Sequence, residues 1–418
     1  MSDCHPPLAD LRIIESSLLG PAALTTCFAD LGAEVIKVES PAGDYIREMT
    51  WPIIEGTSLM HYHLNRGKKS MVLDLKTEEG REIYKELVKD ADVVVETMRP
   101  GALARLGLGF EDLRKVNPEI VFINISGYGA TGPYQRMPSH GIAYDTWAGA
   151  VTPAYDEEGF CYIPEHISVG IAAAPFFGGL AMLAGVLRAR ETGVGCEMEL
   201  GQSDAAAFFD WYRIESHMAY ARPEDVVTGN KADGYKRRPV GTAGMKMGVR
   251  YQLYESADGH VLFMASEQAF WKNFCEGVGR MDLFEKWPGS RYADHAPGNR
   301  ELQAELRDIF RTRTSQEWLQ FSSDVNTPIA PVNTSANIVD DPQFKARFKI
   351  LPHEEHGADM LAFPVHFAGE ELPVPSRAPT VGQHTEEVLR DVLGYGDNRI
   401  QSLRESGALG PGQLKQQA

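Results

Sequence analysis

One uncharged stretch, Val169 to Leu187, constrains the fold of this chain more than any other segment. Its nineteen residues include four glycines, five alanines and Pro175. About 20 apolar residues are needed to cross a bilayer as a helix, so a membrane span has to be considered. Proline is tolerated in the first turn of a helix and poorly inside one, which predicts a helix from about Pro175 to Arg190. The apolar run then shortens to thirteen residues, so we expect a buried core helix instead.

The overall charge argues against some functions. The 418 residues carry 41 Lys and Arg against 58 Asp and Glu, a formal net charge of −17. Non-specific binding of nucleic acid or of an anionic membrane surface needs the opposite sign, so neither partner is expected. Five scattered cysteines without a paired spacing predict neither a disulfide framework nor a metal site. The N-terminus lacks the pattern of a secretion signal, and we expect a cytoplasmic protein.

Strands and helices alternate through the first part of the chain. We expect strands at 11–15, 33–39, 69–75, 91–96 and 117–125, with helices at 21–31 and 78–90 between them. This alternation predicts an α/β fold whose parallel sheet is covered on both faces. The turn after the first strand lacks the G-x-G-x-x-G pattern, so a dinucleotide fingerprint is absent.

Ligands of such sheets bind at the carboxyl ends of the strands. The loops of interest therefore follow Glu39, Glu96 and Ile125. These loops and their surroundings carry six basic residues: Arg47, Arg66, Lys68, Lys69, Arg99 and Arg105. Each one alone is more typical of a solvated surface charge. Together, in an acidic protein, they predict a site for phosphates.

The composition of the sequence changes near Arg222. Residues 1–222 are expected to form the N-terminal part of a large domain, 223–327 a small domain with linkers, and 328–418 the return segment that completes the large domain. Residues 249–266 predict a hairpin that turns at Asp258 and Gly259. The tail from Gly407 onward is expected to be loose.

Several motifs occur in one order along the chain. They are an LLGP turn before LGAEVIKVE, RPG before ARLGLGFEDL, SGYGATGPY, RETGVGCEMELGQSDA, ADGHVLF, PIAPVNT and GQHTEEVL. In this order they resemble the family III CoA-transferases, a group that includes carnitine-pathway and bile-acid CoA-transferases and the alpha-methylacyl-CoA racemases. The resemblance extends from about Leu11 to Leu393. It implies a Rossmann-like large domain, a smaller α+β domain and an intertwined, ring-like dimer.

The same resemblance implies that a coenzyme A thioester binds as a substrate against the large domain, with no tightly bound cofactor and no metal. Carried over by motif, the CoA contacts are Ser17, Leu18, Leu19, Ser40, Lys68, Thr97, Met98, Arg105 and Leu106. Thr97 and Met98 stand where the family commonly has Asn and Phe, so the contacts at these two positions are expected to differ.

The transferases of this family use an aspartate as nucleophile, and its place in this chain falls at Gly170 or Ile171. A carboxylate there would form a mixed anhydride, which the released CoA thiolate converts to an enzyme thioester, provided that the site is dry. Neither Gly170 nor Ile171 can do this. The nearest ionisable residues are Glu165 and His166. Glu165 replaces the aspartate only if its loop is repositioned; otherwise it is an exposed loop carboxylate.

The racemases of the family use a His and an Asp as opposed acid and base. His140, in SHGIAY, lies where they carry GHDINY, and Glu267, in SEQAFW, falls in a comparable place. Histidine suits proton transfer because its ordinary pKa lies near the working pH. The second partner would again be the missing aspartate, and a purely structural role for His140 stays open.

Three enzyme hypotheses follow. The chain is a CoA-transferase that uses Glu165 or another carboxylate, or the nucleophile-free subunit of a heteromeric transferase, or a racemase or epimerase that works through His140. Outside the enzyme class it is a non-catalytic acyl-CoA-binding subunit. We favour the heteromer, which resembles succinyl-CoA:benzylsuccinate-type transferases, because a homologous chain would then supply the catalytic aspartate. The expected partners are an acyl-CoA such as succinyl-CoA, a small carboxylic acid acceptor, and a homologous subunit or a second copy.

Overall fold

The computed structural model describes residues 5–19, 23–231, 234–240 and 245–410. The chain divides into two compact units, Met1–Glu215 with Phe348–Ala418, and Ser216–Arg347. We expected the chain to leave the large domain at residue 222 and to return at 328. The return comes later than expected because Ile329–Pro331 forms strand β13, which pairs with β12 in the smaller unit.

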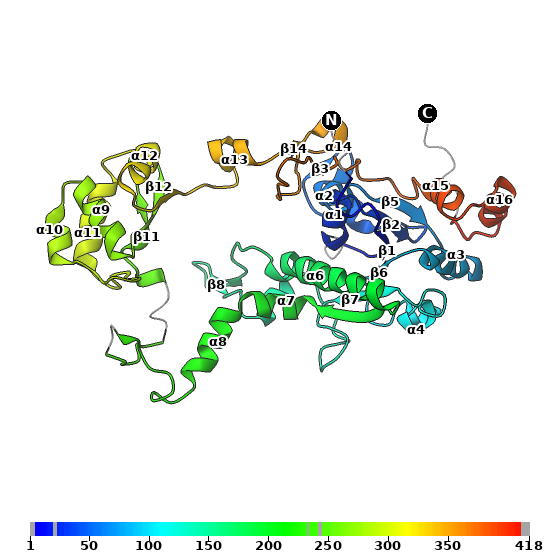
Figure 1. Cartoon of the computed structure of the whole chain (residues 1–418), viewed down its shortest axis with the longest axis horizontal. Coiled ribbons are helices and arrows are strands. Elements are labelled where there is room, and N and C mark those ends of the chain that lie inside the picture. The colour runs from blue at the N-terminus through cyan, green and yellow to red at the C-terminus, as the bar shows by residue number, and fades with distance from the viewer. Residues whose placement is uncertain (1–4, 20–22, 232–233, 241–244, 411–418) are drawn as a thin grey trace. The chain divides into compact units, whose positions relative to one another are not determined.

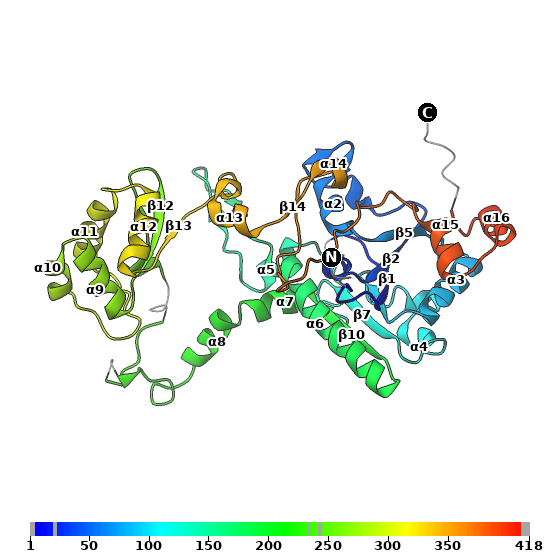
Figure 2. The ribbon, with the colours of Figure 1, turned by 45° about the horizontal axis from the view of Figure 1, so that its top comes forward.

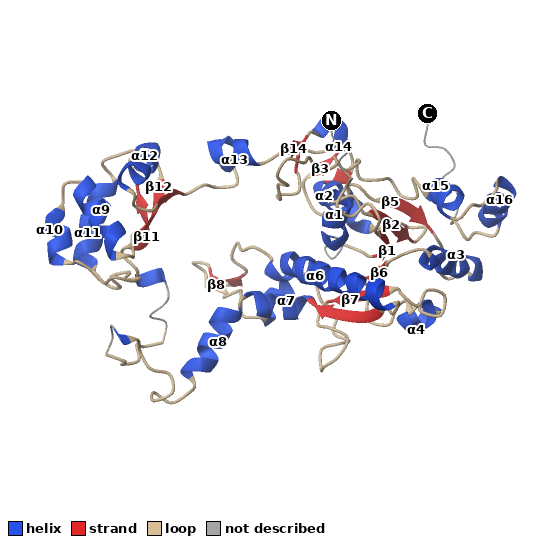
Figure 3. Ribbon diagram, viewed as in Figure 1, coloured by secondary structure: helices blue, strands red, loops and turns tan. Residues whose placement is uncertain are grey.

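A six-stranded sheet forms the centre of the larger unit (Figures 1 and 3). The strand order is β10-β7-β6-β1-β2-β5, and every neighbouring pair is parallel. The strands are β1 (Arg12–Ser16), β2 (Glu34–Glu39), β5 (Lys69–Val72), β6 (Val93–Glu96), β7 (Val121–Ser126) and β10 (Cys196–Gly201). The predicted parallel α/β sheet is therefore confirmed.

Helices cover both faces of this sheet. Side chains of successive strand residues point to opposite faces, so Ile14 enters one core with α3 (Glu78–Lys89) and the C-terminal segment. Ile13 enters the other core with α1 (Ala23–Asp30) and α6 (Val169–Thr192). Burial on both faces explains why the strands read as nearly continuous apolar runs.

Shorter elements complete the larger unit. The helices are α2 (Leu59–Asn65), α4 (Phe110–Leu113), α5 (Ile142–Trp147), α7 (Gln202–Phe209), α14 (His353–His356), α15 (Thr385–Glu387) and α16 (Asp397–Glu405), with single turns at Tyr45–Arg47 and Ala104–Leu106 and a π-helical turn at Val388–Val392. Three small hairpins pair β3 (Ile53–Ile54) with β4 (Thr57–Ser58), β8 (Ala154–Tyr155) with β9 (Cys161–Tyr162), and β14 (Ile350–Leu351) with β15 (Met360–Leu361).

Two further predictions concern the start of the first helix and the C-terminal tail. The helix expected at 21–31 is described from Ala23 onward, and residues 20–22 lie outside the described part. The tail was expected to be loose from Gly407, which is wrong for its first residues, because Ala408 and Leu409 are buried in the core that also holds α3. Residues 411–418 lie outside the described part.

The long helix α6 begins at Val169, so the predicted start at Pro175 was wrong and the proline lies inside the helix. The extra turn is possible because Asp145 of α5 accepts a hydrogen bond from the Gly170 amide at 2.7 Å, which satisfies an amide of the first turn from outside the helix. By length and composition α6 could cross a membrane, but half of its most apolar window is buried in the chain. It packs on α1 and on strands β7 and β10, and Figure 2 shows it beside the two strands.

The smaller unit has a three-stranded antiparallel sheet in the order β11-β12-β13. The predicted hairpin is confirmed, because β11 (Tyr251–Glu255) pairs antiparallel with β12 (His260–Met264). The helices are α9 (Gln268–Gly277), α10 (Met281–Lys286), α11 (Arg300–Phe310), α12 (Ser315–Val325) and α13 (Pro342–Arg347), and α8 (Trp211–Tyr220) spans the boundary between the two units. Aromatic side chains fill the core of the smaller unit, among them Phe263, Phe274 and Trp318.

Candidate active site

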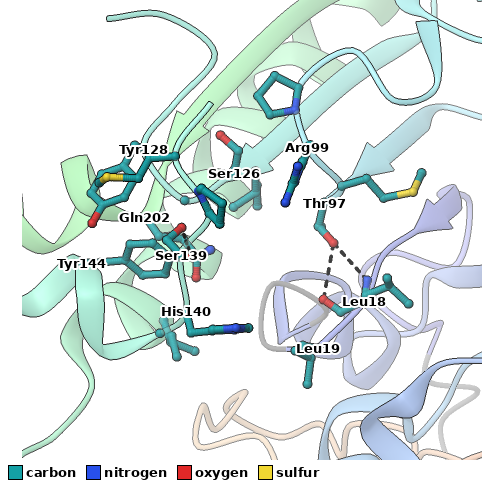
Figure 4. A pocket seen from close by; sticks show the side chains of 18 of the residues that line it. Leu18, Leu19, Thr97, Arg99, Ser126, Tyr128, Ser139, His140, Tyr144 and Gln202 are labelled. Atoms are coloured by element: carbon teal, nitrogen blue, oxygen red, sulfur yellow. Dashed lines mark hydrogen bonds between the residues drawn. The ribbon is translucent and has the colours of Figure 1, made fainter. Parts of the chain in front are cut away.

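A pocket of about 440 Å³ opens at the carboxyl ends of β1, β6 and β7 (Figure 4). This is the edge of the sheet where the sequence predicted ligand binding. The residues 97–100 after β6 and 126–128 at the end of β7 line the pocket, whereas the loop after β2 contributes Tyr45. The other lining residues are Leu18, Leu19, Ile125, Gln135, Arg136, Met137, Pro138, Ser139, His140, Gly141, Tyr144, Ile171 and Gln202.

One wall of the pocket consists of the turn after β1 and the residues that follow β6. The Leu18 amide donates a hydrogen bond to Thr97 Oγ1 at 3.0 Å, which ties the ends of the two strands together (Figure 4). Leu19 adopts a left-handed backbone with φ 59°, a conformation that is uncommon for a residue with a Cβ. We call these two strand ends, residues 17–19 and 97–100, the binding wall.

Beneath the binding wall lies a fully buried group of charges. Glu15 contacts Lys37 at 3.2 Å and Lys68 at 2.9 Å, and all three side chains are completely buried. Burial alone would raise the pKa of Glu15, but Lys68 and Lys37 outweigh it and lower the pKa to about 2. Burial lowers the pKa of Lys68 to about 8 despite the opposing effect of Glu15. Glu15 and Lys37 contact Ser17 in the turn after β1, and the three charged residues do not line the pocket.

The predicted basic cluster is mostly not free to bind phosphate. Arg47 pairs with Glu39 at 2.7 Å and Arg66 with Asp30 at 2.7 Å. Lys68 pairs with Glu15, and Lys69 contacts both Glu34 and Glu387 at 2.9 Å. Their partners are carboxylates of this chain, so four of the six side chains already have structural roles.

One arginine of the predicted cluster, Arg99, lines the pocket together with Arg136, which was not predicted. Arg99 and Arg136 are exposed, and within the described ranges neither makes an ion pair. Figure 4 shows the Arg99 side chain directed toward the centre of the pocket. In a chain of net charge −17, two unpaired guanidinium groups at one pocket favour an anionic ligand.

The structure brings together only part of the predicted CoA contacts. Leu18, Leu19, Thr97 and Met98 line the pocket. The other five residues lie elsewhere: Ser17 and Lys68 are buried, Ser40 is exposed just after β2, Arg105 is exposed with its Nη1 donating to the Pro100 carbonyl at 3.4 Å, and Leu106 packs against the core.

The opposite wall contains Gly170 and Ile171, the two positions at which the sequence predicts the family's aspartate. A Cβ on Gly170 would lie 2.9 Å from Tyr144 Cβ and 3.0 Å from the Gln202 carbonyl oxygen, so no larger side chain fits there. Ile171 lines the pocket and packs so closely on Gly141 that a Cβ at residue 141 would lie 2.1 Å from its Cδ1. We call the surface formed by residues 139–144 and 171 the chemical wall.

The candidate catalytic residues differ in their surroundings. His140 is exposed and lines the pocket, whereas Glu165 is exposed in the segment before α6 and does not line it. Glu267 lies in the smaller unit, at the N-cap of α9, where its Oε2 accepts from Ser266 Oγ at 3.2 Å. Among the described residues that line the pocket, none carries a carboxylate.

Sequence reasoning missed several lining residues. Arg136, Ser139 and Gln202 had no role in any prediction, and Tyr128 was noted only within the SGYG motif. The position of that motif directly after a buried strand was a usable signal; Gln202 likewise directly follows β10. Among the described residues, no group of three or more His, Cys, Asp or Glu is placed to hold a metal ion.

Comparison with known proteins relates this chain to one family. Residues 8–385 match the sequence model of CoA-transferase family III. The human succinyl-CoA:glutarate CoA-transferase is 30% identical over 420 residues, which covers 96% of this chain and 90% of the human protein. The beta subunit of succinyl-CoA–L-malate CoA-transferase from Chloroflexus aurantiacus is 28% identical over 413 residues, covering 95% and 97%.

The fold agrees with solved structures of comparable length. The crystal structure of Rv3272 from Mycobacterium tuberculosis superposes with a TM-score of 0.74 at 27% identity. The match covers 92% of this chain and 99% of that protein. The likeness therefore includes both units of the chain.

Proposed function

The chain belongs to CoA-transferase family III, and from this premise we propose that it moves CoA from succinyl-CoA to a carboxylic acid as one subunit of a heteromeric enzyme. In this arrangement a homologous chain contributes the catalytic aspartate. The similar human protein is a succinyl-CoA:glutarate transferase, and the similar Chloroflexus protein is a beta subunit. Both names support succinyl-CoA as the donor for this chain, and the Chloroflexus name alone supports a subunit arrangement.

The observation that carries the proposal is the composition of the pocket. The binding wall, with Thr97 and Arg99, has groups for an anionic ligand, but no described lining residue offers a carboxylate. Gly170 has no space for a side chain, and Ile171 fills its part of the chemical wall with an apolar group. A chain built in this way suits binding and positioning of an acyl-CoA better than covalent catalysis.

The proposed chemistry divides between two chains. The aspartate of the homologous subunit attacks the thioester carbonyl of succinyl-CoA, and CoA leaves as a thiolate from the mixed anhydride. The thiolate attacks the enzyme's side of the anhydride, which releases succinate and leaves an enzyme thioester. The acceptor carboxylate then repeats these steps in reverse order. The apolar residues of this chain's pocket, such as Leu19, Met137 and Ile171, exclude water that would hydrolyse the intermediates.

Exposed apolar side chains on two helices support an intertwined dimer. On α6, Phe176, Leu180 and Leu187 are 67%, 70% and 69% exposed. On α8, Trp211 and Tyr212 are 50% and 60% exposed. Large apolar surfaces of this kind mark protein interfaces. A homologous chain with the same threading surface would pair as readily as a second copy. We also propose a cytoplasmic location for this protein.

Intact-mass analysis with peptide mapping tests the proposal. The purified chain is incubated with succinyl-CoA alone, and in parallel as the complex with a homologue that co-purifies with it. We expect no covalent adduct on this chain and an acyl or CoA adduct on an aspartate of the homologue. An adduct on Glu165, or robust turnover by the lone chain, would show that the chain is a self-sufficient transferase.

A racemase is the second candidate, because His140 is exposed and lines the pocket. His140 would remove the proton alpha to the thioester carbonyl. Exchange of that proton in heavy water should then occur with the parent chain and vanish in His140→Ala. No exchange in the parent would exclude this activity. Acyl-CoA binding without transfer or exchange, with every candidate homologue present, would identify a non-catalytic binding subunit.

A further inference from the structure

Two buried polar atoms behind the chemical wall face one another without a hydrogen-bond partner in the described chain. They are Oδ2 of Asp145 and Nε2 of His166, 3.8 Å apart. The Asp145 side chain is completely buried and that of His166 is 20% exposed. Buried polar atoms of native proteins are nearly always hydrogen-bonded, so this pair requires an explanation.

The other polar atoms of the two side chains determine where protons lie. Asp145 Oδ1 accepts from the Gly170 amide at 2.7 Å. His166 Nδ1 lies 3.1 Å from the Pro164 carbonyl oxygen, and since a carbonyl only accepts, Nδ1 carries a proton. If Nε2 were unprotonated, its lone pair would face the carboxylate. A second proton on the ring turns this repulsion into attraction.

We propose that Asp145 and His166 form a carboxylate–imidazolium pair that positions the first turn of α6 at the pocket. Both are positioning residues, because neither lines the pocket. This role rests on the proposed function, since Gly170 and Ile171 stand at the place of the family's nucleophile. The pair itself is independent of any activity.

The geometry explains why this turn needs an external anchor. Ser168, the N-cap of α6, makes no side-chain capping hydrogen bond. Asp145 caps the helix instead. Its Oδ1 accepts a hydrogen bond from the Gly170 amide, two residues after Ser168, and its Oδ2 faces Nε2 of His166, two residues before Ser168. A carboxylate is also favoured at the positive N-terminal end of a helix. The anchor therefore sets how Ile171 packs on Gly141 and closes the chemical wall.

Among the described residues, no other charged side chain forms an ion pair with Asp145 or His166. The adjoining Tyr144 hydroxyl lies 3.2 Å from Ser139 Oγ, and the neighbouring Glu165 is exposed. Within the described ranges, Asp145 is the acidic side chain that meets His166 within ion-pair distance.

Nitrogen-15 NMR of the histidine-labelled full chain near neutral pH tests the pair. We expect one imidazolium with both nitrogens protonated, and this signal should disappear in His166→Gln. In Asp145→Asn the same ring should become neutral with its proton on Nδ1, because the amide NH₂ then donates to Nε2 while the amide oxygen still accepts from Gly170. A neutral His166 in the parent, or an unchanged signal in Asp145→Asn, would overturn the proposal. His217→Gln, at an exposed site, is the matched control that removes a different signal.

Hydrogen exchange and CoA binding test the positioning role. In Asp145→Ala, amide exchange of the peptide 167–172 should rise and CoA affinity should fall about tenfold. Asp145→Asn should restore both nearly to the parent values. Unchanged exchange in Asp145→Ala would overturn the role, and if that variant fails to fold, the NMR signal of Asp145→Asn still decides. None of these signals needs turnover, so a chain that never transfers CoA would remove the proposed function and leave this test intact.

Discussion

The two walls of the pocket differ in what lies behind them and in what they offer a ligand. The binding wall rests on the buried residues Glu15, Lys37 and Lys68, and both lysines pair with Glu15. The chemical wall rests on Asp145 and His166, each of which has a buried polar atom without a hydrogen-bond partner in the described chain. The charges behind the binding wall are therefore paired, whereas those behind the chemical wall leave two buried polar atoms without a partner in the described chain.

The chemical wall should respond most strongly to one substitution. Ile171→Asp places a carboxylate in the pocket, at the N-terminal end of a helix, which stabilises a negative charge. After incubation with succinyl-CoA, we expect an acyl or CoA adduct on the peptide that contains residue 171, against none in the parent. Peptide mass mapping measures it.

The matched control for this experiment is Ile171→Asn, which has nearly the same size and no nucleophilic carboxylate. It should remain unlabelled. If Ile171→Asp still binds CoA in calorimetry but forms no adduct, the chemical wall differs from a working one by more than a single side chain.

The foundation of the binding wall should show the next largest effect. Glu15→Ala removes the carboxylate between two buried ammonium groups, and we expect the free energy of unfolding to fall by about 3–5 kcal/mol. Urea denaturation followed by circular dichroism measures the change. Glu82→Ala, which removes one exposed ion pair with Lys85, should cost less than about 1 kcal/mol. Similar losses in both variants would contradict the assigned importance of the buried group.

Acid should weaken the same foundation. The pKa of Glu15 is lowered to about 2 in the folded chain from an ordinary 4.5, so the folded state favours the ionised form. The stability that Glu15 contributes is therefore complete above about pH 4.5 and is lost as the pH falls toward 2. The difference in unfolding free energy between the parent and Glu15→Gln should shrink over this range. A difference that stays constant would show that Glu15 is not ionised with a depressed pKa.

These two walls also mark how far the sequence could predict the structure. The central strands β1, β2, β6 and β7 were predictable because each is a short, mostly apolar run that is buried on both faces of one sheet. The start of α6 was not, because Asp145, which satisfies the Gly170 amide, lies 25 residues earlier in the chain. The basic cluster was misjudged for a similar reason. Lys68 and Glu15 are 53 residues apart, and no local pattern indicates that they are partners.

The prediction of pocket-lining residues was limited in the same way, because contacts between distant segments are not visible in the sequence. Thr97 and Met98 were carried over by motif from the family resemblance, at a strand end that the sequence alone had also indicated, and the structure places both in the pocket. Arg136 was missed because it lies in an irregular segment between β7 and α5, where neither periodicity nor a strand end identifies it. A position at the end of a strand therefore helped to predict pocket-lining residues, whereas residues that reach the pocket through the conformation of a loop could not be predicted.

The smallest effect should distinguish Arg99 of the binding wall from Arg105, which lies outside the pocket lining. Arg99 lines the pocket and is unpaired in the described chain, so Arg99→Ala should weaken CoA binding about tenfold, with the loss reduced at high salt. Arg105, exposed but outside the pocket lining, should matter less if binding follows the pocket instead of the motif. Arg114→Ala, at an exposed site paired with Glu111, is the control for a general change of charge. Calorimetric titration with CoA at two salt concentrations measures all three. A larger loss for Arg105→Ala than for Arg99→Ala would place the phosphates along the contacts implied by the family resemblance, and outside the pocket that Arg99 lines.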